Sequence, residues 1–206
     1  MEDKKDFKIL AKEFLNPHKE YLCSLFPYII LATLVFITGI VAGYYVNKFF
    51  PEKTQELISL LREEYSFILE ANKFSQILFI FLKNGTASFI VLMTGAFFGV
   101  VPVISLVNNG EILGAFGSAF LKEESFLRLL AGILPHGIIE VPFFIISSAM
   151  GLKIGRTVVE RIFKKKGDIK KEVGLALNTF LKIVLVFLFI AAVVEVLITP
   201  ELFMIF

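Results

Sequence analysis

Apolar runs of about twenty residues are the feature that most restricts the fold of this chain. Residues 28–50 carry no charged side chain before Lys48. A helix of about 20 apolar residues spans the hydrocarbon core of a bilayer, and lipid allows only helices and closed barrels to cross it. Hydrophobic residues make up 56% of the chain and charged residues 19%, a balance that indicates a membrane protein. We therefore predict an all-α, polytopic membrane helical bundle.

Further apolar stretches predict about five transmembrane helices. The stretch 74–107 is too long for one span, and Lys83-Asn84-Gly85 interrupts it near its start. A second interruption is expected at 108–111, because its Asn-Gly pair favours a turn. We predict broken or re-entrant segments here, with 102–121 crossing the bilayer. The remaining spans are expected at 126–152 and 174–199.

Charged segments flank the expected spans and give an orientation. Residues 1–27 mix lysines with apolar residues at helical spacing, which predicts an amphipathic N-terminal segment on the cytoplasmic membrane surface. Residues 52–73 predict an acidic amphipathic helix outside the cell. The segment 153–172 is rich in Lys and Arg and should be a cytoplasmic loop. Residues 28–206 then form a single transmembrane domain of the cell membrane, with the N-terminus cytoplasmic and the C-terminus outside.

Glycines spaced four residues apart recur along the expected spans. This spacing lets two helix backbones approach closely, which drives helix association in lipid. We expect a tightly packed bundle and a homo-oligomer, with a dimer favoured, while packing within one chain is the alternative. The predicted packing positions are Gly39, Gly43, Gly95, Gly99, Gly110, Gly114, Gly132, Gly151 and Gly155.

A carboxylate, that of Glu140, interrupts the apolar stretch 126–152, and His136 precedes it by one helical turn. A charged side chain at bilayer depth costs about 2.5–3.5 kcal/mol on insertion scales, so such groups are paired, protonated, metal-bound or in contact with water. Three interpretations stay open. The pair is a hydrogen-bonded contact that fixes helix packing, a proton or divalent-metal site completed across a dimer axis, or the wall of a solute or ion path.

Asn108 and Glu111 are predicted to join His136 and Glu140 in a polar core if their turn lies within the bilayer. Glu195 is expected at the outer interface instead. One His and one Glu are too few to hold zinc, which takes four ligands or three and a water. No cofactor is therefore certain, and a divalent metal at His136 and Glu140 is the one candidate.

Other function classes find little support in the sequence. The net charge of +2 argues against a nucleic-acid partner, and the lone Cys23 argues against an internal disulfide. HExxH, CxxC and Walker A motifs are absent from the sequence. These observations favour a protein that is not an enzyme, with a metal-assisted intramembrane hydrolase as the weakest alternative.

One motif resembles that of a known family. The run 134–142, Leu-Pro-His-Gly-Ile-Ile-Glu-Val-Pro, lies between the glycine pairs of 109–114 and 151–155 and is similar to the stage II sporulation protein M family. The resemblance covers residues 84–155. Its specific part is carried by Pro135, His136, Gly137 and Glu140.

The resemblance implies an all-helical integral membrane protein. In spore-forming bacteria, members of that family act in engulfment as a scaffold that localises two cell-wall-degrading partners. We therefore expect a membrane scaffold that assembles as an oligomer and localises membrane or extracytoplasmic partner proteins. The alternative is a small-solute or ion transporter with a polar site at Glu111, His136 and Glu140.

Overall fold

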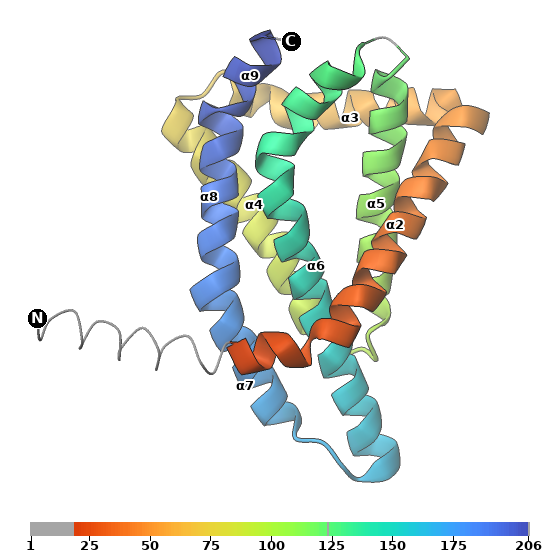
Figure 1. Ribbon diagram of the computed structural model, residues 1–206, viewed down its shortest axis with the longest axis vertical. Coiled ribbons are helices and arrows are strands. Elements are labelled where there is room, and N and C mark those ends of the chain that lie inside the picture. The colour runs from red at the N-terminus through yellow and green to blue at the C-terminus, as the bar shows by residue number, and fades with distance from the viewer. Residues whose placement is uncertain (1–18, 123, 206) are drawn as a thin grey trace, which may run out of the picture.

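In a computed structural model the chain is almost entirely helical (Figure 1). The structure describes residues 19–122 and 124–205, and no strand occurs among them. Most of the predicted N-terminal segment, residues 1–18, lies outside the described residues. The all-α class is confirmed. The helices are α2 (Phe26–Phe49), α3 (Pro51–Leu69), α4 (Lys73–Thr94), α5 (Val100–Phe120), α6 (Phe126–Lys164), α7 (Ile169–Thr179), η1 (Phe180–Val184), α8 (Leu185–Leu197) and α9 (Thr199–Ile205).

Five helical rods are long and apolar enough to cross a membrane: α2, α4, α5, α6 and the continuous rod α7–η1–α8. Within the last rod, η1 is a π-helical turn in which the Leu185 N–H donates to the Phe180 carbonyl, five residues earlier. The rods carry large apolar side chains on their outer faces, such as Leu34 and Phe187, as expected of surfaces that meet lipid tails. The prediction of five transmembrane helices is confirmed.

Helical segments extend across or beyond both ends of the bundle of rods. α3 runs across one end of the bundle and joins α2 to α4, while α6 and α7 project beyond the other end (Figure 1). The predicted amphipathic helix at 52–73 is therefore present, although it ends at Leu69. The predicted loop at 153–172 is mostly helix, because α6 continues to Lys164 and Asp168 caps the start of α7 by accepting from the Lys171 N–H.

The prediction that the Asn-Gly pairs interrupt two transmembrane helices was wrong. α4 runs without a break through 83–85, and α5 runs through 108–111. A continuous helix satisfies every backbone group, which matters more in lipid than the turn preference of two residues. The chain reverses instead at 95–99, where Phe98 and Gly99 have positive φ angles of 57° and 76°. Glycine adopts this left-handed backbone without strain.

Glycines hold α2 against α5 along most of their length. A methyl group at Gly43 would overlap the Glu111 carbonyl, and one at Gly114 would overlap the Ile40 carbonyl. Gly39 and Gly110 meet one turn away in the same manner. The two backbones are thus in direct contact, as small-residue spacing predicts.

A second glycine contact joins the turn after α4 to the middle of α6. Gly95 lies against Gly151, and Gly99 lies against Gly155. Gly132 differs, because it faces the ring of Phe203 in α9 rather than a backbone. Eight of the nine predicted glycine positions therefore lie where two backbone segments of the same chain are in contact. The homo-oligomer is not tested by these contacts and stays a prediction.

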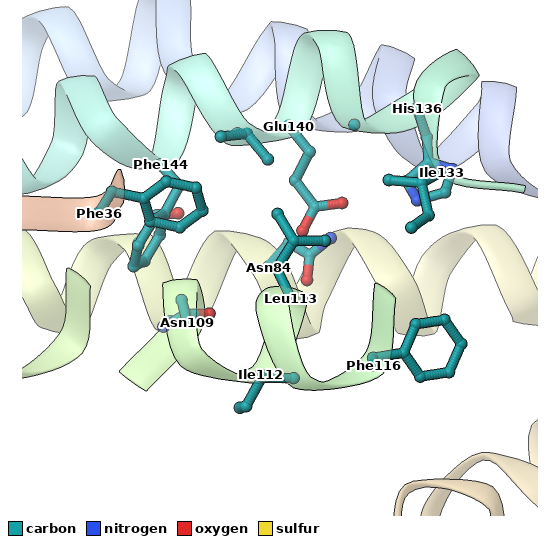
Figure 2. A pocket seen from close by; sticks show the side chains of 14 residues that line it. Phe36, Asn84, Asn109, Ile112, Leu113, Phe116, Ile133, His136, Glu140 and Phe144 are labelled. Carbon is teal, nitrogen blue, oxygen red and sulfur yellow. The ribbon is translucent and has the colours of Figure 1, made fainter. Parts of the chain in front are cut away.

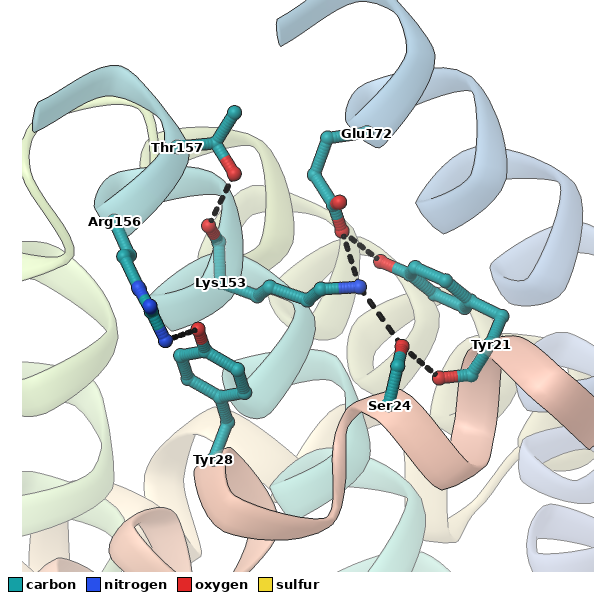
Figure 3. A network of polar contacts seen from close by, with 7 residues as sticks. All are labelled: Tyr21, Ser24, Tyr28, Lys153, Arg156, Thr157 and Glu172. Atoms are coloured by element: carbon teal, nitrogen blue, oxygen red, sulfur yellow. Dashed lines mark hydrogen bonds and ion pairs between the residues drawn. The ribbon is translucent and has the colours of Figure 1, made fainter. Parts of the chain in front are cut away.

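Polar side chains tie the segment before α2 to α6 and α7 (Figure 3). Lys153 Nζ lies 3.2 Å from Glu172 Oε1 and donates to Ser24 Oγ at 2.8 Å. The hydroxyl of Tyr21 donates to the same Glu172 oxygen at 2.8 Å. Burial and the adjacent Glu172 carboxylate raise the pKa of Tyr21 above its ordinary value, so its hydroxyl stays a donor. This network fixes the end of the bundle opposite α3.

Candidate functional site

Three ionisable side chains from two transmembrane rods meet inside the bundle. His136 and Glu140 lie one turn apart on α6, and Glu195 reaches them from α8 near the end of that helix. One imidazole nitrogen and one oxygen from each carboxylate all lie within 4.8 Å of one another. Glu140 is about 21 Å along α6 from Phe126 at the usual helical rise, whereas Glu195 lies close to the end of α8 at Leu197.

Neighbouring polar residues orient this cluster. His136 Nδ1 lies 3.3 Å from the hydroxyl oxygen of Thr199, which donates in turn to the Val194 carbonyl at 3.4 Å. The side chain of Asn84 on α4 hydrogen-bonds to Glu140. The Lys83 ammonium is close enough to act electrostatically on both carboxylates. The site therefore draws residues from α4, α6, α8 and the start of α9.

A cavity of about 250 Å³ opens beside the cluster. Figure 2 shows Glu140 pointing from α6 into this space, with Asn84 beside its carboxylate. His136 lies at the same wall, and Asn109 from α5 borders the cavity farther along. The rest of the lining is mostly apolar, contributed by residues such as Phe36 and Phe144. The cavity thus brings the carboxylate of Glu140 and the imidazole of His136 to one accessible space.

The structure brings together only part of the polar core predicted from the sequence. His136 and Glu140 lie together as expected. Glu111 does not border the cavity, and its backbone packs against Gly43 of α2 instead. Asn108 is exposed, while its neighbour Asn109 borders the cavity. The continuous helix explains this outcome, because without a turn at 108–111 nothing redirects Asn108 and Glu111 towards α6.

Sequence reasoning missed three members of the site, Glu195, Asn84 and Thr199. Glu195 was expected at the outer interface and excluded from the core, and this exclusion was wrong. A signal was present, since Glu195 is a carboxylate within an apolar span just as Glu140 is. Asn84 was seen only as part of an interruption. Thr199, which contacts His136, had no sequence signal that would have set it apart.

An imidazole beside two carboxylates can accept protons or bind a cation. The Lys83 ammonium offsets the charge of only one of the two carboxylates. If His136 is neutral, the group therefore keeps one uncompensated negative charge. Buried groups of this kind inside a transmembrane bundle are typical of binding sites and ion or proton pathways.

Comparisons with known proteins agree with the fold and the motif. A sequence model of the family described as "Stage II sporulation protein M" matches residues 32–200, which include every residue of the cluster. An uncharacterized protein of Methanocaldococcus jannaschii is 36% identical over 129 residues, covering 59% of this chain and 70% of that protein. No solved structure is significantly similar to the chain. With its five apolar rods and a family match over most of its length, the chain is a multi-pass membrane protein that belongs to the stage II sporulation protein M family.

Proposed function

We propose that this protein is a membrane scaffold that localises partner proteins. The proposal rests above all on α3, which lies across one end of the bundle (Figure 1). Only Thr54 and Ile68 are buried among the α3 residues whose burial is described. The large side chains of Leu60 and Phe67 are exposed next to charged residues. An amphipathic helix held at both ends by rigid rods is suited to bind another protein.

The packing of the rods supports the same proposal. The glycine contacts between α2 and α5 place backbone against backbone, which gives a rigid frame on either side of α3. A scaffold needs such a frame, because it must hold its binding surfaces at fixed positions. The proposal assigns no catalytic reaction to the chain, and it leaves the homo-oligomer as a second expectation to be measured.

A photo-crosslinking residue placed at Ser59, which is exposed on α3, tests the scaffold proposal in native membranes. We expect one reproducible protein adduct, and we expect Leu60→Asp with Phe67→Asp to remove it without changing the elution of the purified protein. The same crosslinker at Val186, on the outer face of the last rod, is the matched control. Identical adducts from both positions, or none from α3, would contradict the proposal.

We further propose that the α6–α7 end of the bundle is cytoplasmic and the α3 end faces outward. The Lys and Arg residues of 153–171 support this orientation through the positive-inside rule. The exposed Cys23 allows a direct test with a membrane-impermeant maleimide. We expect labelling of Cys23 only after permeabilisation, and labelling of Ser59→Cys in a Cys23→Ser background in intact cells. The reverse pattern would overturn the orientation.

Cation or proton transport is a second candidate function, favoured by the cluster beside the cavity. A carboxylate that faces a cavity within a span is a common feature of ion pathways. After reconstitution into liposomes, this function predicts ion flux that Glu140→Gln abolishes and Glu111→Gln leaves intact. Absence of flux across a panel of monovalent and divalent cations would exclude it, and the scaffold proposal would be unaffected.

A further inference from the structure

The cluster has the donor set of a metal site within a single chain. The donor atoms of His136, Glu140 and Glu195 lie within 4.8 Å of one another. Two ligands of one ion are at most about 4.2 Å apart, because each lies about 2.1 Å from the metal. Small side-chain adjustments would therefore close the site. No second copy of the chain is needed, since the sequence-based idea of a site across a dimer axis lacked Glu195 as the third ligand.

Thr199 prepares His136 to act as a ligand. Because the Thr199 hydroxyl donates to the Val194 carbonyl, its oxygen is left to accept from Nδ1–H of His136. This arrangement places the proton on Nδ1 and leaves the lone pair on Nε2. Hydrogen bonds from a ligating histidine to a second residue are the usual means of fixing its tautomer and orientation in metal sites.

Asn84 and the cavity complete the site. Asn84 hydrogen-bonds to Glu140, which restrains that carboxylate, and its amide oxygen is itself a suitable ligand for a hard cation. The cavity of about 250 Å³ borders His136, Glu140 and Asn84. It therefore has room for water molecules at coordination positions that the protein leaves open.

We propose that His136, Glu140 and Glu195 bind one divalent first-row transition metal ion, with Asn84 or water completing its coordination. One imidazole with two carboxylates suits Mn²⁺, Fe²⁺ or Zn²⁺, whereas Ca²⁺ and Mg²⁺ prefer oxygen ligands alone. The two carboxylates also balance the charge of a divalent ion, which makes its burial within a span tolerable. The bound ion links α6 to α8.

Lys83 competes with this ion. Its ammonium acts on both Glu140 and Glu195, so in the absence of metal it supplies positive charge to the two carboxylates. Metal and ammonium cannot both lie close to the carboxylates without repelling each other. Removal of the Lys83 charge should therefore strengthen metal binding, whereas a purely structural ion-paired cluster would only be weakened by the same change.

The test measures metal binding to the full chain, purified in detergent and stripped with a chelator. Mn²⁺ and Zn²⁺ are titrated separately, and bound metal is counted by mass spectrometry after removal of excess ion. We expect one ion per chain and a rise in unfolding temperature. We expect Glu195→Gln to weaken binding at least about tenfold, a loss typical of altered metal sites, and Lys83→Met to strengthen it. Glu111→Gln, a carboxylate change outside the cluster, should leave binding unchanged.

Folding of each variant is checked by its elution profile and helical circular dichroism, so a weakened affinity is read only from folded protein. Lys83→Met keeps the assignment testable even if Glu195→Gln fails to fold, because it predicts a gain rather than a loss. Metal binding that is equal in the wild type, Glu195→Gln and Lys83→Met would overturn the assignment, as would the absence of bound metal. This inference does not depend on the scaffold proposal, since its readout is metal content rather than partner capture or flux.

Discussion

The α2–α5 seam and the surroundings of the His136 cluster show two different ways to pack helices in one membrane protein. Between α2 and α5, Gly39, Gly43, Gly110 and Gly114 bring the backbones into direct contact. Around α6, by contrast, His136 and its polar neighbours border a cavity of about 250 Å³. One region has no room for a single methyl group, while the other leaves room for a ligand.

The difference indicates that the α2–α5 seam stabilises the bundle, whereas the region around the cavity contains the polar site. Close backbone contact gives dispersion and dipole interactions over a long seam, which is the main source of helix affinity in lipid. A polar cavity forgoes that packing, so the region that contains it is held by the rest of the bundle. The expected energetic signature is that substitutions in the α2–α5 seam are severe, whereas those beside the cavity are mild. The following substitutions measure that contrast, from the largest expected effect to the smallest.

Gly43→Ala should produce the largest loss. The added methyl overlaps the Glu111 carbonyl, and a backbone cannot move aside as a side chain can. We expect the free energy of unfolding to fall by about 3 kcal/mol, at the upper end of the usual range for overpacking. Unfolding in detergent followed by circular dichroism measures it. Gly174→Ala is the control, because a methyl there would meet no described atom within 4 Å, and equal losses in both variants would remove the contrast.

Ser118→Ala should be the next most damaging change. Asn47 is buried on α2 and donates to Ser118 Oγ of α5 at 3.0 Å. Loss of the acceptor leaves a buried amide without this partner, which costs about 1.5 kcal/mol. The same unfolding assay checks the value. Ser59→Ala on the exposed face of α3 is a matched control, and a loss as large there would show that serine removal itself, rather than the seam, is responsible.

Thr199→Val should cause a smaller loss on the cavity side. It removes the hydroxyl that contacts His136 Nδ1 at 3.3 Å but keeps the volume of the side chain. We expect about 1 kcal/mol from one lost hydrogen bond. Because the cavity lets water replace the missing partner, a loss greater than that of Ser118→Ala would reverse the proposed ranking of the two regions.

Gly137→Ala should have the smallest effect and the opposite sign to Gly43→Ala. A methyl at Gly137 would contact Ile133 Cγ2 at 3.4 Å, an ordinary packing distance. Alanine restricts the unfolded chain more than glycine does, so we expect a gain of about 0.5 kcal/mol. The comparison of these two identical substitutions in one assay is the most direct test. Destabilisation of the Gly137 variant by as much as the Gly43 variant would contradict it.

The fold was largely predictable because its strongest signals are local. Apolar runs identify the spans, and glycines four residues apart identify the faces that meet in the α2–α5 seam. The reversal of the chain at 95–99 was not predicted, because the Asn-Gly pair at 109–110 was expected to form the turn instead. Within lipid, an interrupted helix leaves backbone groups unsatisfied, and this outweighs the local preference of residues such as Asn109.

The site was only half predictable, for a related reason. His136 and Glu140 could be paired from the sequence because they lie one turn apart on one helix. Glu195 and Asn84 come from other rods, and their approach depends on how those rods are rotated about their axes. No pattern within a single helix gives that rotation for a lone polar residue. An unexplained carboxylate within a span is therefore best treated as a candidate partner for every other one.

The π-helical turn at η1 sets the rotation of Glu195. Such a turn accommodates one more residue than an α-helical turn of the same height, so it changes which residues after it face the bundle. Deletion of one exposed residue there, such as Leu181, would let the rod become regular α-helix with Glu195 still directed at His136. Relaxation of the turn without a deletion would rotate Glu195 by about 100° and take it out of the cluster. The five residues of η1 thus set the rotation of α8 relative to α7, and with it the position of Glu195 in the polar site.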